Sequence, residues 1–126
     1  MIFLGTDFER LTFKNIMNKE RFKTCIDACN ACATACEHCA AADLKEEQVK
    51  MLIDCILMDL ECSTICRATV KIMTINGKFA DQMCAICAQA CDACATECEK
   101  HIHMEHCKTC AEQCRKCAGE CRKMAA

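Results

Sequence analysis

A repeat at alternating steps of three and four residues dominates the pattern of apolar and polar positions along the chain. In residues 25–39, CIDACNACATACEHC, a cysteine stands at every recurring position. This spacing places the recurring residues on one face of an α-helix, the seam along which helices pack in a bundle. Alanine, glutamate, lysine and glutamine fill the positions between, and all four favour helix. The pattern therefore predicts amphipathic helices whose inward faces carry thiols.

Four segments with this spacing of three and four residues predict four helices. We expect them at about residues 19–41, 43–74, 79–100 and 105–124. Asp43, followed by two glutamates, marks the start of the second helix, and Asn76-Gly77 is the clearest turn signal. Short connections make neighbouring helices antiparallel. The expected fold is all-α, an up-down-up-down antiparallel four-helix bundle with a cysteine-lined core.

Every cysteine of the chain falls on one of these four seams. The cysteines are Cys25, Cys29, Cys32, Cys36 and Cys39 in the first segment, Cys55, Cys62 and Cys66 in the second, Cys84, Cys87, Cys91, Cys94 and Cys98 in the third, and Cys107, Cys110, Cys114, Cys117 and Cys121 in the fourth. Five cysteines on one helix face form a column about 21 Å long. Asp59 stands where the second segment would have a cysteine. It could hydrogen-bond, bind metal when ionised, or be an ordinary, partly exposed aspartate.

Composition narrows the class of protein. The chain has 126 residues and a net charge of -2, which fits one compact domain and does not suggest binding to nucleic acid or to a membrane surface. No apolar run approaches the roughly 20 residues of a membrane span. The opening MIFLG is too short for the core of a signal peptide, so we expect a cytoplasmic protein. Cysteine accounts for 18 residues, whereas proline is absent and glycine occurs three times. That composition favours helices with free or metal-bound thiols over a loop-rich disulfide framework.

The number and placement of the thiols favour Cu(I) as their ligand. Free cysteine also fills cores as a small hydrophobe, but core filling does not explain why all 18 lie on seams. Structural zinc needs four tetrahedral ligands, usually from loops, and ferredoxin-type clusters use a cysteine run closed by Cys-Pro. Cu(I) accepts two or three sulfurs, and cysteines four residues apart on a helix can hold one ion between them. The CxxxC pairs are 25/29, 32/36, 62/66, 87/91, 94/98, 110/114 and 117/121.

Charge balance predicts how much copper the core could hold. A Cu(I) ion bound by two private thiolates leaves a buried negative charge, which is costly. Sharing each thiolate between ions keeps the interior neutral, so capacity should approach about one Cu(I) per cysteine, with about one proton released per ion. Without metal, protonated thiols pack as small apolar groups and the bundle can stay folded.

Antiparallel topology predicts a loading mouth at one pole of the bundle. Soft or borderline ligands collect there: His38, Met51, His101, His103, Met104 and His106. Histidine and methionine are reversible Cu(I) ligands, although each histidine could also be an ordinary polar loop residue. The opposite pole should be an apolar plug, formed by Phe22, Ile72, Met73, Phe79, Met83 and Met124.

The motifs as a set resemble the cytosolic copper storage proteins. The similarity covers roughly residues 17–126 and rests on CIDACNACATACEHC, DLECSTIC, ICAQACDACATEC and HIHMEHCKTCAEQCRKCAGECRKMAA. The resemblance implies a four-helix bundle storing many Cu(I) ions on the cysteines at these positions, histidine-assisted loading, and a homotetramer. Residues 1–16 precede the usual start of the family. Either Met17 is the initiator, or Phe8, Leu11 and Phe13 belong to an added segment packed on the bundle.

Three other kinds of protein compete with copper storage. One is a structural protein with disulfides between paired CxxxC helices, which would require an oxidising compartment. Another is a protein that sequesters zinc or heavy metals in general, although rigid helices should not easily supply tetrahedral sulfur. The third is a thiol enzyme, but no cysteine stands apart beside a histidine and an orienting carboxylate. We therefore expect no enzyme activity and leave the copper donor and acceptor open.

Overall fold

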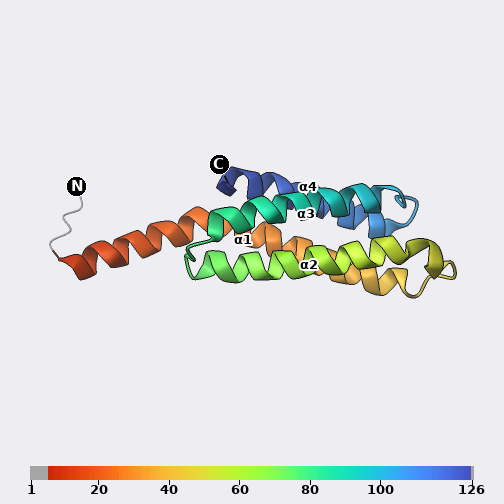
Figure 1. Ribbon diagram of the computed structural model, residues 1–126, viewed down its shortest axis with the longest axis horizontal. Coiled ribbons are helices and arrows are strands. Elements are labelled where there is room, and N and C mark those ends of the chain that lie inside the picture. Colours follow the sequence, from red (N-terminus) through yellow and green to blue (C-terminus); the bar gives the residue numbers. More distant parts are fainter. Residues whose placement is uncertain (1–5, 126) are drawn as a thin grey trace.

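Four long helices lie side by side along one axis (Figure 1). The computed structural model describes the backbone of residues 6–125, and the side chains of these residues except 13–20. The elements are α1 (Asp7–Asp43), a short 3₁₀ helix η1 (Val49–Leu52), α2 (Ile53–Thr74), α3 (Ala80–Glu99) and α4 (Glu105–Ala125). Consecutive helices run in opposite directions, and α4 packs against both α3 and α1. The all-α, up-down-up-down bundle is confirmed.

Helix α1 begins earlier than the expected start near residue 19. The Thr6 side chain caps it by accepting a hydrogen bond from the Glu9 backbone N–H at 3.0 Å. A threonine three residues before a glutamate is a capping signal, and it lies well upstream of the first cysteine. The first turns of α1 project beyond the other helices (Figure 1). Phe8 and Leu11 are 77% and 58% exposed, so neither is packed on the bundle as one alternative required.

The connection between α1 and α2 also differs from the expectation. Asp43 does not start the second helix: it is the last residue of α1 and is fully buried. It lies four residues after Cys39, at the next step of the α1 seam, so continuing the helix keeps its side chain on the inward face. The chain then turns through η1, and α2 begins only at Ile53.

The turn between α2 and α3 matches its sequence signal. Asn76 has a φ of 51°, a left-handed conformation that asparagine tolerates. The Gly77 N–H then donates to the Ile72 carbonyl at 2.8 Å, which closes the end of α2. A Cβ at Gly77 would lie 2.9 Å from Ile72 Cγ2, so a larger residue here would force Ile72 to shift.

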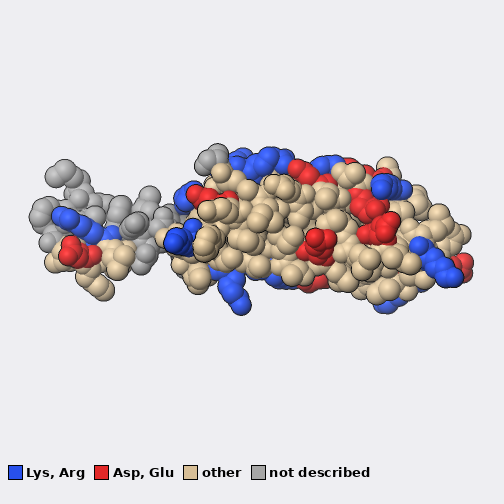
Figure 2. All heavy atoms as spheres, viewed as in Figure 1, with Lys and Arg blue, Asp and Glu red and all other residues tan. Residues whose placement is uncertain are grey.

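Small side chains fill the bundle interior and its margins. All 18 cysteines are buried, and Ala33, Ala95 and Ala118 beside them are fully buried as well. Phe22 and Met73 close the pole where α2 meets α3, as expected, but Phe79 is 59% exposed and does not join that plug. On the outer surface, acidic and basic side chains both occur along the bundle, with uncharged areas between them (Figure 2). The helices therefore enclose a narrow interior that is lined mainly by cysteine side chains.

Candidate metal centre

The cysteine side chains form a column of sulfur atoms along the bundle axis. Each cysteine is at most 1% exposed, and all 18 are free thiols. Neighbouring sulfurs on different helices lie 3.5 Å apart at the closest, between Cys29 and Cys117, and 4.0 Å apart between Cys32 and Cys62. A disulfide requires about 2.05 Å. The structure therefore places the thiols in contact without linking them.

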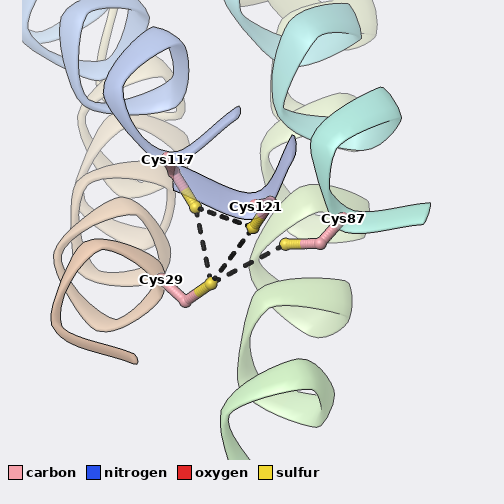
Figure 3. A group of neighbouring side chains, drawn as sticks. All are labelled: Cys29, Cys87, Cys117 and Cys121. Carbon is pink, nitrogen blue, oxygen red and sulfur yellow. Dashed lines mark hydrogen bonds between the residues drawn. The ribbon is translucent and has the colours of Figure 1, made fainter. Parts of the chain in front are cut away.

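A group of four thiols near the plugged pole shows how the helices contribute. Cys29 of α1 lies 3.5 Å from Cys117 and 3.6 Å from Cys121, both of α4 (Figure 3). Its sulfur is also 3.9 Å from that of Cys87 on α3. The α4 pair is itself a CxxxC step, with its two sulfurs 3.9 Å apart. Three helices thus converge on one level of the column.

Similar groups continue toward the middle of the bundle. In each group, four sulfurs from three helices lie within 4.8 Å of one another. The groups are Cys66, Cys87, Cys91 and Cys117; Cys32, Cys62, Cys66 and Cys91; Cys32, Cys36, Cys62 and Cys114; and Cys36, Cys94, Cys110 and Cys114. Adjacent groups share members, so no thiol set is isolated from the next. Cysteines from different helices complete each set, so four sulfurs lie close together although no single helix supplies all of them.

Asp59 is an internal member of the column. Its side chain is fully buried, and its Oδ1 accepts hydrogen bonds from Cys94 at 3.2 Å and from Cys110 at 3.4 Å. Cys98 also donates to Oδ1, and Cys55 donates to Oδ2. Burial, followed by the charge of Cys110, raises the pKa of Asp59 to about 8. The partly exposed alternative is therefore excluded, and the hydrogen-bonding one is confirmed.

Burial opposes ionisation of the thiols in the column, while contacts among them raise the pKa of some cysteines and lower that of others. The hydrogen bond between Cys29 and Cys117, contacts with other thiols and burial together raise the pKa of Cys29. At the plugged pole, the contact of Cys84 with Cys25, and burial, raise the pKa of Cys84. The Cys84 sulfur also lies 3.7 Å from the thioether of Met73. A soft metal ion that binds here must therefore displace protons.

The predicted mouth contains a surface hollow of ≈ 550 Å³. Its lining includes four of the predicted soft ligands, namely Met51, His101, His103 and Met104. The rings of His101 and His103 have centroids 6.4 Å apart, and His101 Nε2 lies 4.0 Å from a carboxylate oxygen of Glu97. The structure does not bring His38 to this hollow: it is exposed on the outer side of α1 and is not among the lining residues.

The last predicted histidine, His106, lies in a different environment from the hollow. Its Nε2 is 2.7 Å from Oδ1 of the buried Asp43, and Cys107 Sγ donates to the same oxygen at 3.5 Å. Cys107 in turn lies 3.8 Å from Cys39. Sequence reasoning missed Asp43 as a site residue. Its spacing of four from Cys39 was the signal that could have found it.

The fold and the site together define a metal-binding helical bundle with a thiol-lined core. The family model described as copper storage protein matches residues 18–126, and the chain belongs to this family.

Individual relatives give the same result. A cysteine-rich protein of Bacillus subtilis strain 168, YhjQ, is 46% identical over 88 residues, which is 70% of this chain and 81% of the relative. The Cu(I)-bound copper storage protein BsCsp3 is 44% identical, with a TM-score of 0.81 over 84% of this chain and 99% of that one. The copper storage protein Ccsp from Streptomyces lividans, loaded with 10 copper equivalents, is 37% identical, with a TM-score of 0.81 and 85% of each chain covered. Among the described residues, none of the helices has the length and apolar character needed to cross a membrane.

Proposed function

We propose that this protein stores Cu(I) ions inside the bundle on its 18 cysteine thiolates. The observation that carries the proposal is the column of buried, free thiols, most of which are linked by sulfur contacts of 3.5–4.0 Å. Thiolates are soft ligands that suit Cu(I), and neighbouring sulfurs at these distances can share ions. The similar structures support this assignment, since one is Cu(I)-bound and another is loaded with 10 copper equivalents.

Sharing of thiolates sets the expected capacity. With one Cu(I) per thiolate the charges cancel inside a core that excludes water, whereas isolated pairs would leave buried negative charge. The overlapping four-thiol groups provide the shared sulfurs that this arrangement needs. We therefore expect a capacity of about one Cu(I) per cysteine and about one proton released per ion.

The hollow at the mouth supplies a loading route. Met51 and Met104 offer thioethers and His101 and His103 offer imidazoles, all of which bind Cu(I) more weakly than thiolates do. Cu(I) ions that bind first to these weaker ligands would then transfer to the thiolates inside the bundle, which bind Cu(I) more strongly. His38 is exposed and does not line the hollow, so we leave it out of the proposed route.

An anaerobic titration against a Cu(I)-specific chelator tests storage directly. The expected result is that the protein withdraws many ions per chain from the chelator, approaching its number of thiols. Zinc is the specific competitor, because the four-thiol groups could also hold a tetrahedral ion. Excess Zn(II) should not reduce the Cu(I) uptake. Uptake of only a few Cu(I) ions, or displacement of Cu(I) by Zn(II), would contradict the proposal.

The family resemblance further suggests a cytoplasmic homotetramer, and the surface of α2 supports self-association. Ile53, Leu57 and Leu60 are 49%, 60% and 48% exposed, and their spacing of four and three places them along one stripe. Exposed apolar stripes of this kind are typical of subunit interfaces. A Leu57→Glu, Leu60→Glu variant should dissociate the oligomer in light scattering with its helix content unchanged. An unchanged mass, or a monomeric wild type, would contradict this assignment. One similar Streptomyces lividans protein is described as cytosolic, which supports the compartment.

A further inference from the structure

We infer that Met73 is a Cu(I) ligand: its thioether, with the thiolates of Cys84 and Cys25, binds the ion at the plugged end of the column. The inference rests on the proposed storage of Cu(I) and adds to it a ligand that is not a cysteine. Met73 lies in the last turn of α2 and Cys84 in the second turn of α3, on either side of the tight turn between these helices. Thioethers are soft ligands that suit Cu(I), as thiolates are.

The spacing of residues along α2 places Met73 on the inward seam. The alternation of three and four residues leads from Cys66 to Thr69 and from Thr69 to Met73. Thr69 is 0% exposed and Met73 is 1% exposed, as residues on the inward seam should be. The Thr69 hydroxyl donates to the Ile65 carbonyl at 2.7 Å, so its hydrogen is used within its own helix. Met73 thus carries a sulfur at a position where a cysteine would continue the column.

The Met73 sulfur is already in contact with the column. Cys84 Sγ donates a hydrogen bond to Met73 Sδ at 3.7 Å. Cys84 also contacts Cys25, whose sulfur lies 3.6 Å from that of Cys121. At a metal–sulfur distance of about 2.3 Å, two of three trigonal ligands lie about 4 Å apart. The sulfurs of Cys84 and Met73 are therefore separated by nearly the distance that a shared ion requires.

Replacement of one hydrogen by one ion converts this contact into a metal site. The S–H bond of Cys84 breaks, its proton leaves for solvent, and Cu(I) takes its place on the sulfur. The Met73 lone pair that accepted the hydrogen then coordinates the ion. The thioether has no proton to lose, so it adds a third sulfur ligand without further proton release.

Charge balance explains why a thioether suits the end of the column. A central thiolate such as that of Cys32 has thiol neighbours on three other helices and can share its charge among several ions. At the end of the column there are ions on one side only. A further thiolate there would add a buried negative charge with few ions to balance it, whereas a thioether is neutral.

Core filling alone does not account for the sulfur of Met73. Leucine has nearly the same volume and would close the pole equally well. Met83 and Met124 at the same pole are partly exposed, whereas Met73 and Phe22 are each 1% exposed. Water therefore does not compete with an ion for the Met73 thioether.

X-ray absorption at the selenium edge tests the assignment. The protein is prepared with selenomethionine in place of methionine and loaded anaerobically with Cu(I). We expect copper at bonding distance from selenium, and a smaller copper signal in Met73→Leu, which keeps the side-chain volume. Met51 and Met104 at the hollow can add to this signal, but both remain in the variant. Met83→Leu, at the same pole, is the matched control and should retain the full signal.

A chelator titration of the same variants gives a second readout. Met73→Leu should bind one Cu(I) per chain at least roughly tenfold more weakly than the wild type. Circular dichroism verifies that the apo variants fold. Normal uptake with equal selenium–copper signals in the wild type and Met73→Leu would overturn the ligand role and leave storage intact. Uptake of only a few Cu(I) ions by the wild type would instead overturn storage, and the ligand role with it.

Discussion

Replacement of Cys32 and Cys36 tests the sulfur column at its centre. Cys32 lies within 4.0 Å of thiols on each of the other three helices: Cys62, Cys91 and Cys114. Cys36 contacts Cys94, Cys110 and Cys114 at 3.7–3.8 Å. The pair thus touches five other thiols, and its removal takes the α1 ligands out of the shared-ligand network at its centre.

The structure sets the size of the expected effect. One copper per thiolate predicts a loss of about two Cu(I) per chain, and a larger loss if ions shared with the five neighbours are also released. Serine places hydroxyls among weak thiol partners, which costs roughly 1–3 kcal/mol for each unsatisfied group. Alanine instead leaves two small voids at about 1 kcal/mol each. Domains of this size are stable by about 5–15 kcal/mol, so the alanine version should remain folded.

Capacity is measured by anaerobic Cu(I) titration against a chelator, alongside denaturant unfolding of the apo form. Cys84→Ala is the matched control: its sulfur lies at the plugged pole, 3.7 Å from a methionine thioether. It should cost about one ion and leave the central groups intact. If the Cys32→Ala, Cys36→Ala protein stays folded and binds as many ions as the wild type, the shared-thiolate account is refuted.

Further predictions concern the column and its mouth. Asp59 releases its proton near pH 3.8 when unfolded and near pH 8 when folded, so the apo unfolding free energy should fall by a few kcal/mol between these values. Asp59→Asn should remove that fall in denaturation curves measured at several pH values; parallel curves for the two proteins would contradict the burial effect. His101→Ala with His103→Ala should slow Cu(I) loading several-fold in stopped-flow traces and leave the final stoichiometry nearly unchanged. An equal rate would exclude the hollow as the route. Alkylation of the protein purified without reductant should modify all 18 cysteines, and any cystine found by mass spectrometry would count against storage.

Local periodicity was sufficient to predict most of the fold. The alternation of three and four places each cysteine on an inward face, and the turn at Asn76-Gly77 was correctly located. The first residues of the first two helices were not correctly predicted, because other residues near them also carry helix-start signals. Thr6 caps α1 far upstream of the first cysteine, and Asp43 resembles a helix start although it continues the α1 seam.

The site was predictable in composition but not in its contacts. Sequence spacing identified every buried thiol, because burial of a seam position follows from helix geometry alone. It could not separate His106, which bonds a buried aspartate, from His38, which faces solvent one residue before Cys39. That difference depends on how α4 is placed against α1, since helix rotation and axial offset determine which side chains meet.

By itself, then, the sequence determined that four helices form and that sulfur occupies their shared interior, because both follow from a repeat that each helix carries within its own residues. Only the tertiary structure decided which thiols meet, why Asp59 holds its proton, and that Asp43 closes the column beside His106. Those outcomes depend on contacts between residues distant in the chain, such as Asp59 with Cys94 and Asp43 with His106. Helix packing distances and the rotation of each helix against its neighbours set them, and no local pattern encodes either.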